Sequence, residues 1–175
     1  AEVGEWCDFL LSNGRLLSQN QGGNKTKFHY KFEKPAVAYL ISLIVGDYQK
    51  YEQSYKDIPV EYFVYPHHSK EDALRSFGRT PIMMEFFSDY IGFEYPYSKY
   101  TQTIITEFMY GGMENISATT QTDRTMHTEQ AHLDHSSDGL VAHELAHQWW
   151  GDLITCREWS DFWLNEGFAT YFTYL

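Results

Sequence analysis

The motif H-E-x-x-H from His143 to His147, followed by Glu166, constrains the fold of this chain more than any other feature. Side chains four residues apart lie one turn above each other on the same helical face, so both imidazoles can reach a single point. The 18 residues between His147 and Glu166 allow one helix to end at Gly151 and a second helix to bring the carboxylate back. We therefore expect two packed helices, from about 139 to 150 and from near Ser160 to the end.

Two histidines and one carboxylate form a donor set that is typical of a catalytic zinc site with an open fourth position. We expect His143, His147 and Glu166 to hold one Zn²⁺ per chain. Glu144 projects from the same helix beside the ligands without being one of them. It can act as general base and take a proton from a water that zinc activates. Such a site suits hydrolysis of a carbonyl bond.

The charge of the chain excludes several classes of partner. With 24 acidic against 13 basic residues, the formal net charge is -11. Nucleic-acid binding wants clustered Lys and Arg, and an anionic membrane surface repels acidic proteins. No run of about 18 apolar residues occurs, so we expect a soluble chain without a transmembrane segment. The compartment stays open, because both a cytoplasmic and an exported protein fit this sequence.

The first third of the chain has the pattern of an antiparallel sheet. Turn residues surround Asn13 and Gly22, and the segments between them alternate as strands do. The apolar stretch from Val37 to Tyr48 predicts one long, largely buried strand. The polar stretch from Gln49 to Asp57 is the best candidate for a boundary. We expect the end of a β domain at 1–54 and a catalytic domain at 55–175.

The second part mixes strands and helices. Apolar residues from Ser69 to Ile91 follow helical spacing, and Pro81 within them predicts a kink or a break into two helices. Gly111 and Gly112 indicate a turn. We assign the tryptophans to the core rather than to a substrate pocket: Trp149, Trp150, Trp159 and Trp163. The expected strands are 59–65, 100–108 and 116–121, and 122–138 is expected to be a polar loop.

A second motif, G-G-M-E-N from Gly111 to Asn115, precedes the histidine helix by about 30 residues. Together the two motifs resemble the aminopeptidase N family of zinc exopeptidases, which includes leukotriene hydrolase, a group within the gluzincins. All fixed positions of the family pattern are present. The flanking segments His147 to Leu153 and Trp163 to Ala169 are also similar to that family, as is the stretch Tyr39 to Tyr48.

This resemblance implies an α/β (α+β) fold, with a thermolysin-like metallopeptidase catalytic domain preceded by part of an antiparallel β domain. It also implies peptide substrates with a free N-terminus. Glu114 would bind the α-amino group, because a carboxylate is the right partner for a buried ammonium. Gly111, Gly112 and Met113 would present backbone groups to an extended peptide, and Asn115 completes this substrate-binding segment.

The resemblance leaves alternatives open. The family's oxyanion-stabilising tyrosine lies further downstream than Leu175, and part of its amine-binding set lies upstream of Ala1, so we interpret the chain as a fragment of a longer enzyme. A zinc-binding fragment without catalysis is one alternative. Another is a zinc hydrolase of a different substrate class, such as an endopeptidase or an epoxide hydrolase.

Overall fold

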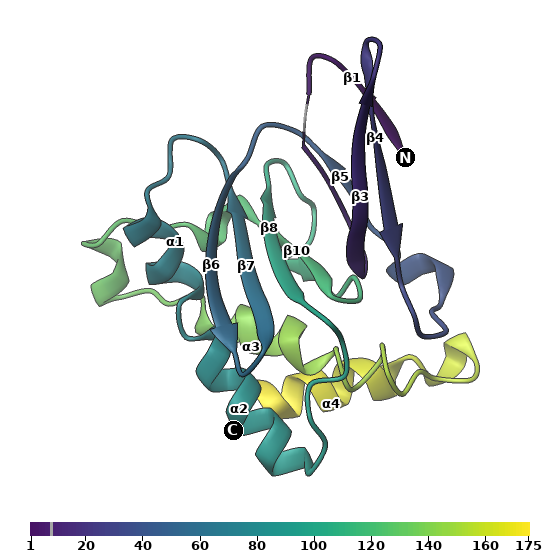
Figure 1. Cartoon of the computed structure of the whole chain (residues 1–175). Helices are drawn as coiled ribbons and strands as arrows, with labels where there is room; N and C mark the ends of the chain where they lie inside the picture. Colours follow the sequence, from purple (N-terminus) through teal and green to yellow (C-terminus); the bar gives the residue numbers. More distant parts are fainter. Residues whose placement is uncertain (8) are drawn as a thin grey trace.

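The computed structural model describes residues 1–7 and 9–175, which fold into a protein of the α+β class (Figure 1). The strands are β1 (Glu2–Gly4), β2 (Leu10–Ser12), β3 (Arg15–Gly22), β4 (Lys25–Lys31), β5 (Leu43–Val45), β6 (Gln49–Tyr55), β7 (Ile58–Val64), β8 (Tyr100–Ile105), β9 (Gly112–Met113) and β10 (Ala118–Thr122). The α-helices are α1 (Lys70–Phe77), α2 (Thr80–Ile91), α3 (Asp138–Ala146) and α4 (Trp163–Thr173). Short 3₁₀ helices are η1 (Ala38–Leu40), η2 (Asp123–Thr125), η3 (Ala131–Leu133) and η4 (Trp159–Asp161).

Across the described residues the strands form three sheets. The largest has the order β6-β7-β8-β10-β9. Its three central strands β7, β8 and β10 are parallel, and the edge strands β6 and β9 are antiparallel to their neighbours. The smaller sheets are β1-β4-β3 and β2-β5, both antiparallel.

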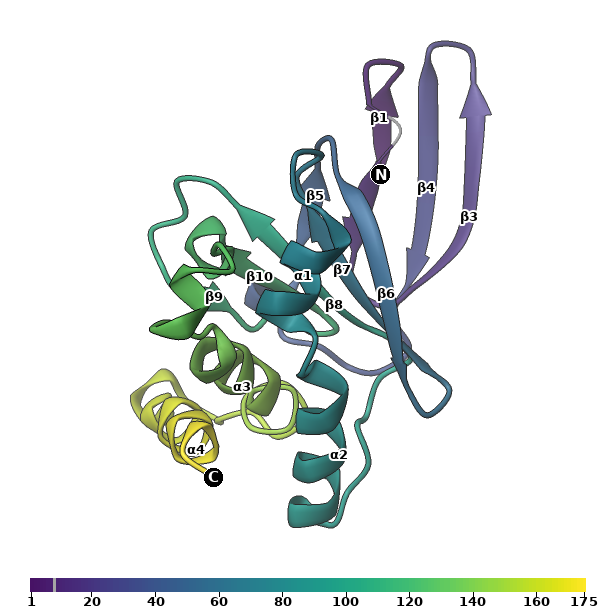
Figure 2. The same ribbon diagram turned by 90° about the vertical axis from the view of Figure 1, so that its left-hand side faces the viewer.

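The helices gather beside the large sheet, away from the β3–β4 hairpin (Figure 2). Helix α1 contacts β7, α2 contacts β6, and α3 packs on α4 and β9. The main core lies between them and is built around large buried side chains such as Tyr62, Tyr100 and Trp149. In the described part of the chain, no helix combines the length and the apolar character needed to cross a bilayer.

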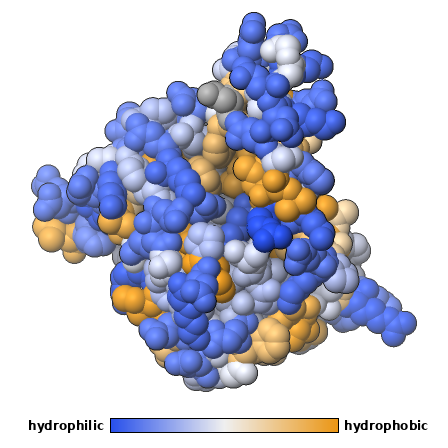
Figure 3. All heavy atoms as spheres, viewed as in Figure 1, coloured by the Kyte–Doolittle hydropathy of each residue, from blue (hydrophilic) through white to orange (hydrophobic). Residues whose placement is uncertain are grey.

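The β3–β4 hairpin projects from the molecule and carries mostly hydrophilic side chains (Figure 3). A small core joins this hairpin to β1 and β2; it consists of Val3, Leu10 and Phe28, with Tyr30 packed against it. The antiparallel pairing of β1 and β3 with β4 confirms an antiparallel sheet in the first third of the chain.

The single long strand that we predicted from Val37 to Tyr48 is wrong. The segment contains η1 and the three-residue strand β5, and Val37, Ile41 and Leu43 are exposed. The reason lies in distant contacts: the Leu40 carbonyl oxygen accepts hydrogen bonds from Asn13, Asn115 and Ile116, which bends the backbone out of a strand. Apolar composition alone does not distinguish this bent segment from a buried strand.

The polar stretch from Gln49 to Asp57 forms β6 and the turn into β7. It is polar because an edge strand faces water on much of its surface, not because it is a linker. The boundary that we placed between residues 54 and 55 falls at the end of this strand. The division into two domains stays a prediction.

The predicted helix from Ser69 to Ile91 is two helices, as Pro81 indicated. The break falls at Gly78 and Arg79, and Pro81 occupies the first turn of α2, where a missing N–H costs nothing. Helix α1 begins with a capping box, in which Ser69 and Asp72 each accept a hydrogen bond from the other's backbone.

Lys99, just before β8, connects the N-terminal strands to the large sheet. Its Nζ donates to the Ser12 carbonyl oxygen at 2.8 Å and lies 5.2 Å from the centre of the Tyr30 ring. The side chain is buried, and burial lowers the pKa of Lys99 to about 8, which Glu61 partly opposes and Lys50 reinforces. The folded protein therefore holds this proton less tightly than the unfolded chain.

We expect the substitution Lys99→Met to show how the lowered pKa of Lys99 changes the stability of the protein with pH. Between pH 8 and the ordinary lysine pKa of 10.5 the unfolded chain binds more protons, so the contribution of Lys99 to stability rises with pH there and is constant below. The variant lacks this change. Its free energy of unfolding relative to the parent should therefore fall by about 2 kcal/mol from pH 7.5 to pH 9.5.

Chemical denaturation of both proteins at the two pH values measures this difference, in which the tyrosine titrations common to both proteins cancel. A difference that stays the same at the two pH values would show that Lys99 keeps its ordinary pKa.

Candidate active site

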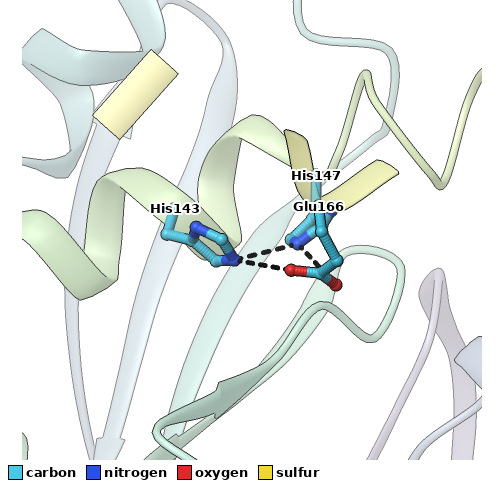
Figure 4. A group of neighbouring side chains, drawn as sticks. All are labelled: His143, His147 and Glu166. Carbon is cyan, nitrogen blue, oxygen red and sulfur yellow. Dashed lines mark hydrogen bonds and ion pairs between the residues drawn. The ribbon is translucent and has the colours of Figure 1, made fainter. Parts of the chain in front are cut away.

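Helix α3 and helix α4 bring three potential metal ligands together, as the sequence predicts (Figure 4). His143 lies in the last turn of α3, and His147 follows as its C-terminal cap residue. Their Nε2 atoms are 3.2 Å apart. Glu166 from α4 places Oε2 at 3.3 Å from Nε2 of His143 and Oε1 at 3.6 Å from Nε2 of His147.

These distances fit a zinc ion. Two donors that each lie 2.0–2.1 Å from a tetrahedral ion are about 3.3–3.4 Å apart. The ring of His147 is also oriented for ligation, because its Nδ1 lies 2.9 Å from the Trp150 carbonyl oxygen. Only the protonated nitrogen can donate there, so Nε2 keeps its lone pair for a metal.

The charges of the site favour a cation. Hydrogen bonds from His143 and then from His147 hold the pKa of Glu166 far below its usual range. Burial alone would lower the pKa of His147, but Glu166, Glu114 and Glu144 outweigh it and raise that pKa to about 9. A site that draws a proton onto the His147 imidazole in this way offers the same negative surroundings to a divalent metal.

Glu144 is placed to act beside the ligands. It is buried in α3, and a carboxylate oxygen of Glu144, one of Glu114 and a ring nitrogen of His147 all lie within 4.8 Å of one another. Burial, with smaller contributions from Glu114 and Glu166, raises the pKa of Glu144 to about 8 against the opposing effect of His147. The carboxylate thus has a raised affinity for a proton, which a general base requires.

The turn that we predicted at Gly111 and Gly112 is wrong for Gly112. Gly112 and Met113 form β9, which pairs with β10 at the edge of the large sheet, because the Gly111 carbonyl oxygen accepts a hydrogen bond from Thr122 at 2.8 Å. A Cβ atom on Gly112 would overlap the side chain of Glu144. The glycine therefore lets this strand lie against the Glu144 side chain.

Glu114 follows β9 and is buried, and its Oε1 has no hydrogen-bond partner among the described residues. Its backbone is fixed by Gln148, which comes directly after His147. The Gln148 amide donates to the Glu114 carbonyl oxygen at 3.1 Å and accepts from the Ser117 N–H at 2.8 Å. The segment that carries Glu114 is thus tied to the histidine turn.

Asn115 is turned away from the cavity that its neighbours line. Its Nδ2 donates to the Leu40 carbonyl oxygen at 3.4 Å, and its Oδ1 accepts from the Thr120 hydroxyl at 2.9 Å. Among the residues that we grouped as substrate-binding, Asn115 therefore has its side chain engaged inside the protein.

A cavity of 840 Å³ opens over these residues. It brings together the predicted set and several side chains that the sequence did not indicate. The predicted residues that line it are Gly111, Gly112, Met113, Glu114, His143, Glu144, His147 and Glu166. The others are Tyr39, Tyr110, Gly139, Leu140, Trp159, Phe162, Thr170, Thr173 and Tyr174.

The assignment of all four tryptophans to the core is wrong for two of them. Trp149 is buried, and its indole N–H donates to the Phe93 carbonyl oxygen at 2.9 Å. Trp159 and Trp163 are instead exposed by 68% and 67%, and Trp159 lines the cavity. The polar neighbours Glu158 and Ser160 were a usable signal for Trp159, whereas Trp163 begins α4 between apolar residues and gave no such signal.

Comparison with known proteins agrees with this geometry. The peptidase family M1 domain matches residues 75–175. Aminopeptidase N of Streptomyces lividans is 37% identical over 145 residues, which are 77% of this chain and 16% of that protein. Aminopeptidase M1 of Arabidopsis thaliana is 32% identical over 173 residues, 94% of this chain and 19% of that protein. Endoplasmic reticulum aminopeptidase 1 of Mus musculus is 30% identical over 171 residues, 94% of this chain and 18% of that protein.

The chain spans less than a fifth of the length of each of these relatives. The matched region nevertheless includes His143, His147, Glu144 and Glu166, all of which line the cavity. The chain belongs to the peptidase family M1.

Proposed function

We propose that this protein is a zinc-dependent aminopeptidase, which hydrolyses the N-terminal residue from peptides. The observation that carries the proposal is the single cavity that combines the three metal donors, the Glu144 carboxylate and the buried carboxylate of Glu114. Membership of the family, and relatives that are themselves called aminopeptidases, support it.

The residues present divide the chemistry among them. His143, His147 and Glu166 would hold zinc, which when bound polarises a scissile carbonyl and activates water. Glu144 accepts the proton of the attacking water on its carboxylate and passes it to the amine that leaves. Its burial keeps competing water away from this transfer and raises its proton affinity.

Substrate binding would use the strand edge and the second carboxylate. The outer edge of β9 is unpaired within the described sheet, so an extended peptide can add to it through backbone hydrogen bonds. The peptide's α-ammonium group would then lie against Glu114, whose Oε1 lacks a partner in the protein. The contact between the α-ammonium group and Glu114 would fix the position of the substrate's first residue in the cavity.

We expect the substitution Glu144→Ala to separate zinc binding from catalysis. The three metal donors remain, so the purified variant should contain about one zinc per chain like the parent. Hydrolysis of aminoacyl-anilide substrates should fall by roughly 10²- to 10⁴-fold, which is the usual contribution of a general base. Elemental analysis and initial rates provide the two measurements.

The exposed Glu85 on α2 offers a matched control, and Glu85→Ala should keep both zinc and activity. Stoichiometric zinc without hydrolysis in the parent would contradict a peptidase and leave a zinc-binding protein.

The substitution Gly112→Ala tests the contact between β9 and the general base. The added methyl group overlaps the Glu144 side chain and should push its carboxylate out of position, while the metal donors on α3 and α4 are untouched. We expect kcat to fall by at least about tenfold with zinc content unchanged. The control is Gly22→Ala in the β3–β4 hairpin, where a Cβ meets open space. Full activity of Gly112→Ala would mean that Glu144 is free to move aside.

The need for a free amine can be measured with paired substrates. Acetylating the N-terminus removes the charge that Glu114 would bind, and we expect hydrolysis of the acetylated peptide to be undetectable. Glu114→Gln should raise KM for the unblocked peptide by roughly 10- to 100-fold, because a hydrogen bond between two charged groups is lost. Equal rates on blocked and unblocked peptides would instead indicate an endopeptidase.

A further inference from the structure

Tyr39 is a cavity residue that comes from a distant part of the chain. It lies in η1, and its ring packs against Trp159 and Phe162, with centroid distances of 5.2 Å and 6.3 Å. All three rings line the cavity. The two aromatic neighbours restrict the directions in which the phenol can point, so the hydroxyl is held rather than free to turn to solvent.

The backbone beside Tyr39 is fixed to the segment that carries Glu114. The Leu40 carbonyl oxygen accepts hydrogen bonds from the Ile116 N–H at 3.3 Å and from Nδ2 of Asn115 at 3.4 Å. Nδ2 of Asn13 donates to the same oxygen at 3.1 Å. Because Leu40 is fully buried, these hydrogen bonds are shielded from water. They hold the backbone at Tyr39 next to the segment that carries Glu114.

Several buried polar atoms in this corner of the cavity have no partner among the residues described. They include the Tyr39 hydroxyl and Oε1 of Glu114, together with both carboxylate oxygens of Asp152 and Nδ2 of Asn165. A buried polar atom without a hydrogen bond costs about 1–3 kcal/mol, so the protein gains when a ligand supplies the missing bonds. A ligand common to Tyr39 and Glu114 must carry donors, because a carboxylate only accepts.

The Tyr39 phenol remains neutral at any ordinary working pH. Burial raises the pKa of Tyr39 well above its usual value, and Glu114 and Asp152 raise it further. The side-chain amide of Asn165, whose Nδ2 is also buried without a partner among the described residues, opposes this shift. A neutral phenol keeps an oxygen that accepts and one proton that it can donate to an anionic neighbour.

We infer that the Tyr39 hydroxyl is a second recognition group for the substrate's free α-ammonium, acting together with Glu114. An ammonium has three N–H donors, of which Glu114 accepts one and the Tyr39 oxygen accepts another. The Tyr39 proton is then free to bond a carboxylate oxygen. Tyr39 is a positioning residue, and its role rests on the proposed aminopeptidase function.

The test uses binding, measured for the parent and for each variant in the Glu144→Ala background, where zinc is retained and leucinamide is not hydrolysed. Calorimetry on the zinc-loaded proteins compares leucinamide with 4-methylpentanamide, which has the same side chain and amide but no amine. The parent should prefer leucinamide. In Tyr39→Phe the Kd for leucinamide should rise by about 10- to 100-fold, as expected for a lost hydrogen bond to a charged group, while the Kd for 4-methylpentanamide stays unchanged.

Zinc content and thermal unfolding show whether the variant is intact. Tyr39→Phe removes an unpartnered buried hydroxyl and keeps the ring, so its Tm should equal or exceed that of the parent. A purely structural hydroxyl would not give this combination of retained stability and lost amine preference. The control Tyr90→Phe removes an exposed hydroxyl on α2 outside the cavity and should leave both Kd values unchanged.

Each outcome decides a separate point. An unchanged amine preference in Tyr39→Phe overturns the inference, and so does a parent that does not prefer leucinamide. A parent that prefers leucinamide but hydrolyses no aminoacyl-anilide contradicts the proposed function alone, and the comparison with Tyr39→Phe still decides the role of the phenol.

Discussion

The buried amide of Gln148 holds the two halves of the candidate site in register. It accepts from the Ser117 N–H and the Tyr95 hydroxyl and donates to the Glu114 carbonyl oxygen. Because it follows His147 directly, the strand segment and the histidine turn cannot shift independently without leaving a buried polar group unpaired. The separation between metal donors and Glu114 therefore depends on one fully buried side chain.

The parts of the fold that followed from the sequence are those set by local spacing. The helical period of H-E-x-x-H required α3, and Pro81 required a helix break because its ring cannot continue a helix. The parts that failed depend on partners far away in the chain. The bend at Leu40 needs donors from Asn13 and Ile116, and β9 is a strand of two residues that exists only through its pairing with β10.

The candidate site divides in the same way. His143, His147 and Glu166 were predictable, because metal coordination demands particular residue types at particular helical positions. Tyr39 was not predictable as a cavity residue, because nothing in the apolar sequence around it distinguishes it from a core tyrosine. The use of Asn115 inside the protein was also hidden, because its acceptor lies 75 residues away in sequence. A motif fixes which residues occur together but not which way each side chain turns.

The distances along the chain between parts of the site have a consequence for the order in which the protein assembles. The metal donors come from two helices that are neighbours in sequence, so they can meet after a short loop closes. The pairing of η1 with the segment after Glu114 closes a far longer loop, which costs more chain entropy and forms more slowly. A newly made chain would thus assemble the proposed metal donors before the proposed amine-binding groups come together.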